Sequence, residues 1–113
     1  MHNGRRFLAM LLVLFALVVL MIAVGGLTRA MTSEWAGYGI NCNAIGPGYI
    51  STELTQALFE DKAFSDWLLG STPAGRWGQV DDLVGAAIYL AAPASGFMHG
   101  QILYIDGGMT TTV

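Results

Sequence analysis

The chain has 113 residues, enough for one small domain, and 54% of them are hydrophobic against 12% charged, an unusually apolar balance. Residues 1–30 contain three arginines and no acid, whereas residues 31–113 contain all eight carboxylates and two basic residues, a charge of −6. An acidic body argues against nucleic acid as a partner, and one cysteine with two isolated histidines gives neither a disulfide framework nor a metal site.

The N-terminal stretch, residues 1–26, begins with a basic hexapeptide followed by an unbroken apolar run from Phe7 to Val24. About 20 apolar helical residues span a bilayer core, and this run has no polar face for a surface helix. We therefore predict a transmembrane span over residues 7–27, with a cytoplasmic N-terminus because arginines precede it. The alternatives are a cleaved signal peptide and a fusion or truncation artefact; if the segment is not native, the expected location is cytoplasmic.

Residues 27–113 are predicted to form the folded domain. Apolar residues recur at helical spacing from Leu27 to Tyr38, and glycines at positions 37 and 39 end this helix. The apolar run Gly39 to Cys42 then predicts a short strand. Cys42 lies inside this run, where a buried reduced thiol is the expected role.

The loop predicted after that strand is Asn43-Ala44-Ile45-Gly46-Pro47-Gly48-Tyr49-Ile50-Ser51-Thr52. Its proline fixes one backbone angle and removes a donor, and its glycines permit angles that other residues avoid. Such a loop can present backbone N–H and C=O groups to a flat polar ligand. The alternative interpretation is an ordinary strand-to-helix turn.

The remaining elements alternate between helix and strand. Two short helices are expected over Glu53–Leu58 and Lys62–Leu69, followed by a helix from Val80 to Ala91. Asp81 and Asp82 stand at the start of the last helix, where carboxylates stabilise free N–H groups. A second strand is expected over residues 101–105. Strands joined by helical crossovers indicate an α/β fold with parallel strands.

Three motifs occur together in the second half of the chain. They are the loop at residues 43–52, the stretch Thr72-Pro73-Ala74-Gly75-Arg76-Trp77-Gly78, and the end of the second strand, Tyr104-Ile105-Asp106-Gly107-Gly108. In this order and spacing they resemble the C-terminal third of classical short-chain dehydrogenases/reductases, nearest the gluconate 5-dehydrogenase-like branch. The resemblance implies a C-terminal fragment of a Rossmann-type doubly wound parallel sheet, with residues 53–69 as a mobile lid.

The resemblance also implies an NAD- or NADP-dependent oxidoreductase of the sugar-acid or polyol type. By resemblance, the cofactor-binding residues carried over are those of the loop after the first strand: Pro47, Gly48, Tyr49, Ile50 and Thr52. In the family, the backbone at the positions of Ile50 and Thr52 meets the nicotinamide carboxamide. The choice between NAD and NADP is not readable from this stretch.

No catalytic residue is carried over. Counting along the family pattern places Leu17 where the catalytic Tyr would stand and Met21 where the Lys would stand, and none of the tyrosines has a lysine four residues later. The family's glycine-rich loop and catalytic Ser also lie upstream of the matching region. We therefore expect a truncated chain that is inactive and binds no cofactor by itself. The alternatives are a membrane-anchored module that pairs with a full-length relative, and a decayed gene product; a homo-oligomer is the other partner considered.

Overall fold

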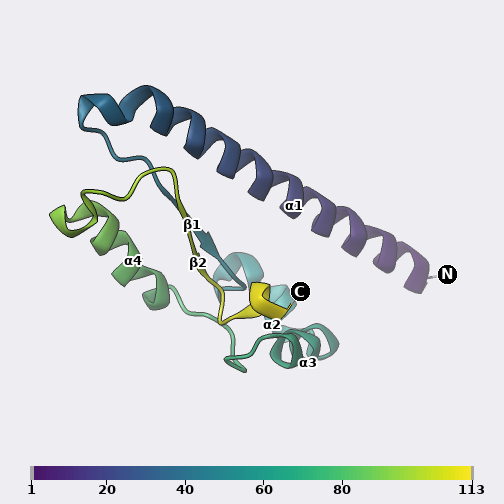
Figure 1. The fold of residues 1–113 in the computed structure, drawn as a ribbon. Coiled ribbons are helices and arrows are strands. Elements are labelled where there is room, and N and C mark those ends of the chain that lie inside the picture. Colours follow the sequence, from purple (N-terminus) through teal and green to yellow (C-terminus); the bar gives the residue numbers. More distant parts are fainter. Residues whose placement is uncertain (1, 113) are drawn as a thin grey trace. The chain divides into compact units, whose positions relative to one another are not determined.

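The computed structural model describes residues 2–112 and divides into two compact units. Unit 1 comprises Met1–Ala44 and His99–Gln101, and unit 2 comprises Ile45–Met98 and Ile102–Val113. Helices and strands alternate along the chain in Figure 1. The α/β class expected from the sequence is therefore confirmed.

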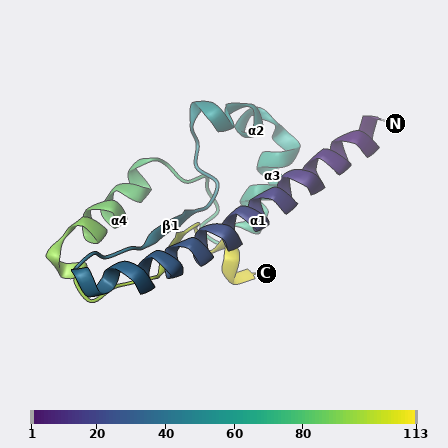
Figure 2. The ribbon, with the colours of Figure 1, turned by 90° about the horizontal axis from the view of Figure 1, so that it is seen from above.

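Unit 1 is built on one long helix, α1 (His2–Trp35), which Figure 2 shows as uninterrupted. Near its C-terminal end the Thr32 hydroxyl donates hydrogen bonds to the carbonyl oxygens of Thr28, at 2.8 Å, and Cys42, at 3.1 Å. The Gly100 amide donates to the same Cys42 carbonyl at 2.8 Å. These bonds connect the last turns of α1 to two segments distant in sequence.

The helix ends as the glycines predicted. A short 3₁₀ helix, η1 (Ala36–Tyr38), follows α1, and Gly39 adopts a φ of +79°, in the left-handed region that favours glycine.

The N-terminal prediction requires correction. Among the residues that the structure describes, no helix is both long and apolar enough to cross a membrane. The structure therefore does not support the transmembrane span predicted over residues 7–27. The apolar run is the first part of a longer helix, which continues through polar turns containing Arg29, Ser33 and Glu34. The division of the chain at residue 26 stays a prediction.

The sheet consists of β1 (Ala44–Pro47) and β2 (Ile102–Ile105). The Ala44 amide donates to Gln101 O at 2.8 Å, and the Gly48 amide donates to Ile105 O at 2.9 Å. Donors and acceptors advance along the chain in the same direction, so the two strands are parallel, as expected.

The second strand lies where it was predicted, but the first begins later than expected. β1 occupies the first half of the predicted loop instead of the run Gly39–Cys42. Pro47 is compatible with this position because alternate amides, those of Ala44 and Gly48, point toward β2. The missing N–H of Pro47 therefore falls on the side away from β2.

The helices of unit 2 agree with the predicted pattern. In chain order they are η2 (Glu53–Thr55), α2 (Gln56–Glu60), α3 (Lys62–Ser71), α4 (Asp81–Ala91), η3 (Pro93–Ser95) and η4 (Met109–Thr112). Asp61 caps α3 by accepting a hydrogen bond from the Phe64 amide at 3.1 Å. Asp81 and Asp82 open α4, and α4 contacts β2.

The core of unit 2 is small and aromatic. Leu68 and Trp77 are only 1% and 6% exposed, and the Trp77 indole donates to the Ser65 hydroxyl at 2.9 Å. Tyr49 meets the ring of Trp77 edge-on at a centroid distance of 6.0 Å and that of Phe64 at 5.6 Å. This cluster fixes α3 against the segment that follows β1.

Candidate functional site

Unit 2 contains a cleft of about 250 Å³ at the ends of both strands. Its walls come from the segment after β1, from α3, from the loop before α4 and from the turn after β2. The lining residues are Gly48, Tyr49, Ile50, Leu68, Thr72, Ala74, Arg76, Gly78, Asp82, Ile105, Asp106 and Gly107. A cleft at the carboxyl ends of parallel strands is where ligands bind in open α/β sheets.

The floor of this cleft is backbone packed against backbone. A Cβ atom at Gly48 would lie 2.7 Å from the Cα of Asp106, which is too close for any side chain. Gly78 forms a parallel bridge with Ile50, and its amide donates to Tyr49 O at 2.9 Å. Glycine at positions 48 and 78 therefore allows three chain segments to meet at one point.

The backbone amides of the loop differ in their availability. The Thr52 amide donates to the Thr55 hydroxyl at 2.9 Å, and that hydroxyl donates to Ile50 O at 2.7 Å. Within residues 2–112, the Ile50 amide has no hydrogen-bond acceptor. The Ile50 amide is therefore available as a donor, whereas the Thr52 amide is already bonded.

Three of the five residues carried over by resemblance line the cleft: Gly48, Tyr49 and Ile50. Pro47, which is exposed at the end of β1, and Thr52, at the N-cap of η2, do not. Burial raises the pKa of the Tyr49 phenol, so this side chain is neutral at pH 7.

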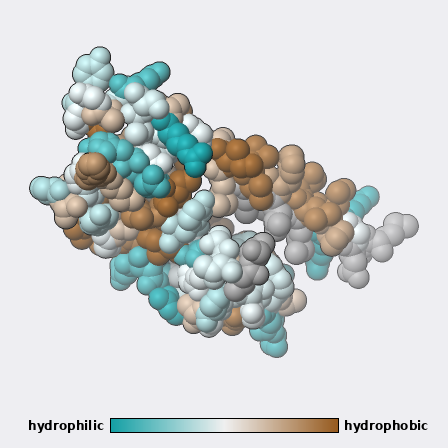
Figure 3. Space-filling model, viewed as in Figure 1, coloured by the Kyte–Doolittle hydropathy of each residue, from teal (hydrophilic) through white to brown (hydrophobic). Residues whose placement is uncertain are grey.

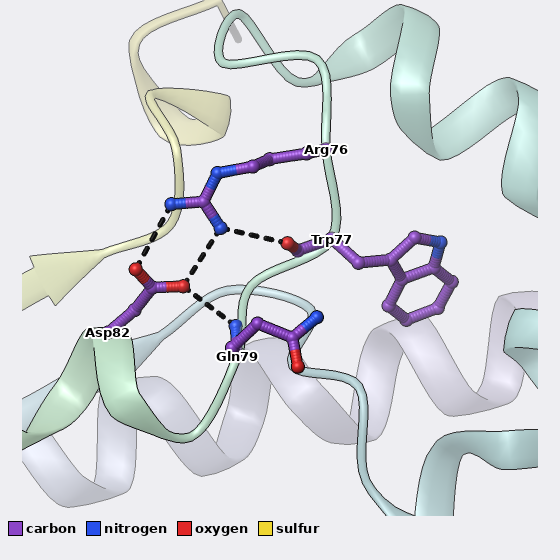
Figure 4. Close-up of polar contacts among 4 residues, drawn as sticks. All are labelled: Arg76, Trp77, Gln79 and Asp82. Carbon is purple, nitrogen blue, oxygen red and sulfur yellow. Dashed lines mark hydrogen bonds and ion pairs between the residues drawn. The ribbon is translucent and has the colours of Figure 1, made fainter.

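A bidentate ion pair closes one wall of the cleft (Figure 4). Arg76 Nη1 and Nη2 donate to the two oxygens of Asp82 at 2.9 and 3.0 Å, and Nη1 also donates to Trp77 O at 3.0 Å. The Gln79 amide donates to Asp82 at 2.7 Å. These hydrogen bonds, that of Arg76 foremost, lower the pKa of Asp82 to about 2. Both charges are thus engaged with each other, and the pair holds the loop before α4 in place.

Asp106 organises the turn after β2. Its carboxylate accepts hydrogen bonds from the Gly108 amide at 2.9 Å and the Thr110 amide at 3.1 Å. Hydrogen bonding, with Thr110 as the largest contributor, lowers the pKa of Asp106. Gly107 and Gly108 have φ of +67° and +89°, which the turn requires. This carboxylate therefore serves the turn, and no set of three His, Cys, Asp or Glu in residues 2–112 is arranged to hold a metal.

Sequence reasoning alone did not assign Leu68, Thr72, Ala74 or Arg76 to the site. The last three lie in the motif at residues 72–78, which was noted as a resemblance but not as part of a pocket. Leu68 gave no signal beyond its place on an amphipathic helix.

Comparison with known proteins assigns the family. Residues 18–110 match the family profile described as Enoyl-(Acyl carrier protein) reductase. The chain belongs to the short-chain dehydrogenase/reductase family. The match begins inside the apolar run of α1, so the later part of that run belongs to the family's fold.

Several sugar-acid enzymes among the short-chain dehydrogenases/reductases are similar to this chain. The chain is 50% identical over 91 residues to the gluconate 5-dehydrogenase of Gluconobacter oxydans and, equally, to the 5-keto-D-gluconate 5-reductase of Escherichia coli. Both comparisons cover 80% of this chain and 36% of the relative. The chain thus spans about a third of the length of these relatives.

A solved structure supports the same branch of short-chain dehydrogenases/reductases. The gluconate 5-dehydrogenase of Burkholderia cenocepacia, crystallised with NADP and tartrate, is 59% identical, with a TM-score of 0.78. The matched region is 80% of this chain and 36% of the Burkholderia cenocepacia chain. The resemblance to the C-terminal third of the gluconate 5-dehydrogenase-like branch, and to its Rossmann-type fold, is therefore confirmed.

The family's catalytic Tyr and Lys have no counterparts at the predicted positions. Met21, at the place of the Lys, is an apolar residue of α1 with 44% of its surface exposed. The side chain of Leu17, at the place of the Tyr, lies outside those that the structure describes.

Proposed function

We propose that the chain supplies the nicotinamide-side wall of an NAD(P)-dependent oxidoreductase acting on sugar acids or polyols. The observation that carries this proposal is the unbonded Ile50 amide in a cleft at the carboxyl ends of β1 and β2. The Burkholderia cenocepacia relative was crystallised with NADP and tartrate, which supports a dinucleotide as the cofactor and a small hydroxy acid as the substrate.

The residues present fit one end of such a cofactor. A nicotinamide carboxamide is flat and needs a donor for its carbonyl oxygen, and the Ile50 amide is a donor without an acceptor in the described residues. Gly48 and Gly78 let the segments that line this cleft pack closely against one another. Leu68 and the half-buried Tyr49 give the cleft an apolar wall that excludes water.

The bound nicotinamide would supply hydride transfer to or from a carbon that bears oxygen. The residues of this chain orient the ring: Ile50 through its N–H, and Tyr49 through a rigid aromatic contact network. The Arg76–Asp82 pair keeps the neighbouring loop in place and pairs these two charges with each other.

Proton transfer needs groups that this chain does not carry. Its 113 residues contain no Tyr-x-x-x-Lys pair, the unit that donates and accepts the proton in this family. Loss of such a unit costs several orders of magnitude in rate. We therefore expect the 113-residue chain by itself to show no cofactor-dependent oxidation of gluconate; turnover by the purified chain would contradict this part of the proposal.

A chimera tests the wall itself. The segment of the Gluconobacter oxydans enzyme that aligns with residues 27–110 is replaced by those residues, so that the enzyme keeps its own catalytic Tyr and Lys, and gluconate oxidation is measured. We expect activity to be retained. Replacing Ile50 by proline in the chimera removes the donor and should raise the KM for the dinucleotide, whereas Ile50→Val keeps the N–H and serves as the matched control.

Thermal unfolding of each chimera separates function from folding. A chimera that unfolds cooperatively but neither binds dinucleotide nor oxidises gluconate would refute the proposal. Equal KM values for Ile50→Pro and Ile50→Val would refute the role of the amide.

A second candidate function is pairing with a full-length family member. In the described residues the sheet has two strands, so β1 and β2 each have an edge without a strand partner. Such edges accept a strand from another chain. Light scattering of this chain mixed with the Gluconobacter oxydans enzyme would reveal a mixed complex, and separate elution of the two proteins would exclude it.

A further inference from the structure

The guanidinium of Arg76 uses only some of its hydrogen-bond donors. An arginine side chain has five N–H groups. Nη1 donates twice, to Asp82 at 2.9 Å and to Trp77 O at 3.0 Å, and Nη2 donates once, to Asp82 at 3.0 Å. Within residues 2–112, the N–H of Nε and the second N–H of Nη2 therefore have no acceptor.

These two free N–H groups lie on one edge of the guanidinium plane. Asp82 occupies the end-on edge, formed by Nη1 and Nη2, and this leaves the side-on edge, formed by Nε and Nη2. Two parallel N–H groups at this spacing match the two oxygens of a carboxylate. In Figure 4 the free edge faces the pale yellow ribbon of β2 and the turn after it, whose residues Asp106 and Gly107 line the same cleft.

The free edge is the place in this wall that attracts an anion. Among the residues that line the cleft, Arg76 alone carries a positive charge, and its side chain is 58% exposed. The carboxylates of the wall already have donors. Asp82 accepts from Arg76 and from the Gln79 amide, and Asp106 accepts from two amides of the turn after β2. Neither carboxylate needs the free edge of Arg76.

Thr72 supplies a second polar group in the same cleft. This residue is 7% exposed and lines the cleft. Its hydroxyl has no hydrogen-bond partner in the described part of the chain, yet it is not sealed from solvent, because His99 Nδ1 alone is both fully buried and unpartnered there. Polar groups on residues this deeply buried are normally hydrogen-bonded. A ligand hydroxyl in the cleft would satisfy the hydroxyl of Thr72.

We propose that the cleft binds a hydroxy acid, with its carboxylate on the Nε and Nη2 edge of Arg76 and one of its hydroxyls on Thr72. This inference rests on the proposed function and narrows its substrate class from sugar acids or polyols to sugar acids. A neutral polyol has no group that takes both N–H groups of the edge. Arg76 is thus a specificity-determining residue for the substrate, whereas the Ile50 amide serves the cofactor.

The first test follows the arginine Nε–H signals of the full chain by two-dimensional ¹⁵N NMR while sodium gluconate is added. The chain has four arginines, and Arg5, Arg6 and Arg29 are exposed residues of α1, outside the cleft. The Arg76 signal, identified by its loss in Arg76→Lys, should shift and saturate, whereas the other three should not. Sorbitol carries CH₂OH in place of the carboxylate and should leave the signal unmoved. An Arg76 signal that does not shift, or that shifts equally with sorbitol, would overturn the proposal.

Two substitutions separate the free edge from the ion pair, with gluconate binding measured by calorimetry. Arg76→Lys keeps the charge but lacks the paired donors, so the dissociation constant should rise at least about 10-fold. Asp82→Asn keeps the free edge and removes a neighbouring negative charge, so gluconate should bind more tightly. Equal weakening by both variants would show that Arg76 acts only through its pair with Asp82, and would overturn the proposal.

Thr72→Val removes the hydroxyl while keeping the charge and nearly the shape of the side chain. The dissociation constant for gluconate should rise by about 2-fold to 10-fold, the effect of one hydrogen bond. Lys62→Gln is the control for charge, because Lys62 pairs with Asp66 on the exposed face of α3 and does not line the cleft. It should bind gluconate as the wild-type chain does. Urea midpoints show that each variant is folded, and a folded Thr72→Val with wild-type affinity would overturn the role of Thr72.

The acid site and the cofactor wall are tested separately. Gluconate binding needs no cofactor and is measured in the 113-residue chain, whereas the KM for the dinucleotide of the Ile50 variants is measured in the chimera. Gluconate binding to the chain together with equal KM values for the Ile50 variants would support the acid site and refute the role of the amide. The opposite pair of results would refute the acid site alone.

Discussion

Replacing Leu68 by alanine is expected to destabilise unit 2 by about 2–3 kcal/mol. The substitution removes three carbon atoms from a side chain that is 1% exposed, and each buried carbon contributes about 0.8 kcal/mol. Enclosed leucines cost about 2–5 kcal/mol because a cavity remains as well. Leu68 lines the cleft, so the space it leaves opens to solvent and the cavity contribution is small.

Urea denaturation followed by tryptophan fluorescence measures this effect, because Trp67 and Trp77 both lie in unit 2. With a slope of about 1–3 kcal/mol per molar for small proteins, the midpoint should fall by about 0.7–3 M. Leu54→Ala is the matched control, since Leu54 is 95% exposed and should change stability by less than about 0.5 kcal/mol. Equal midpoints for the two variants would show that Leu68 is not the centre of this core.

Two further predictions concern the walls of the cleft. Arg76 lowers the pKa of Asp82 to about 2, so the stability from this pair is complete above about pH 4 and is lost as the pH falls toward 2. In the Asp82→Asn variant the urea midpoint should therefore depend less on pH over that range. A pH dependence equal to that of the wild-type chain would show that the pair does not contribute to stability. Gly48→Ala should cost about 1–3 kcal/mol, because its Cβ would lie 2.7 Å from Asp106 Cα. Gly70→Ala meets no atom within 4 Å and should not destabilise; equal losses in the two glycine variants would contradict the close packing at Gly48.

The sequence predicted most helices of unit 2 because their signals are local. Asp81 and Asp82 mark a helix start in the sequence, and they open α4 in the structure. The strand at residues 102–105 is equally clear, because four consecutive bulky residues are followed by Asp106 and a glycine pair. Each of these elements is specified by its own residues and its flanking turn.

The first strand lies later than the apolar run Gly39–Cys42 predicts, because its position depends on pairing with β2. Whether Pro47 breaks a strand depends on which edge its missing N–H occupies, and that depends on β2, more than 50 residues later. The span predicted from the run Phe7–Val24 is not supported, since the described residues contain no helix that is long and apolar enough to cross a membrane.

The candidate site was predicted in part. Tyr49 and Ile50 come from the loop that the sequence singled out, and both line the cleft. Arg76 and Leu68 could not be assigned because their place in the wall follows from tertiary packing. The ion pair from Arg76 to Asp82, six residues later, exists only after the intervening loop has folded back onto α4.

Gly48 and Gly78 limit how mutations can change the shape of this cleft. A side chain at Gly48 would meet the backbone of Asp106, and one at Gly78 would have to displace the Ile50 side chain, so mutation at either position disturbs the base of the cleft. Changes in ligand preference among relatives should therefore accumulate on the opposite wall, at positions such as Leu68, Thr72 and Ala74. A library aimed at new substrates would gain most by varying those three positions while keeping both glycines constant.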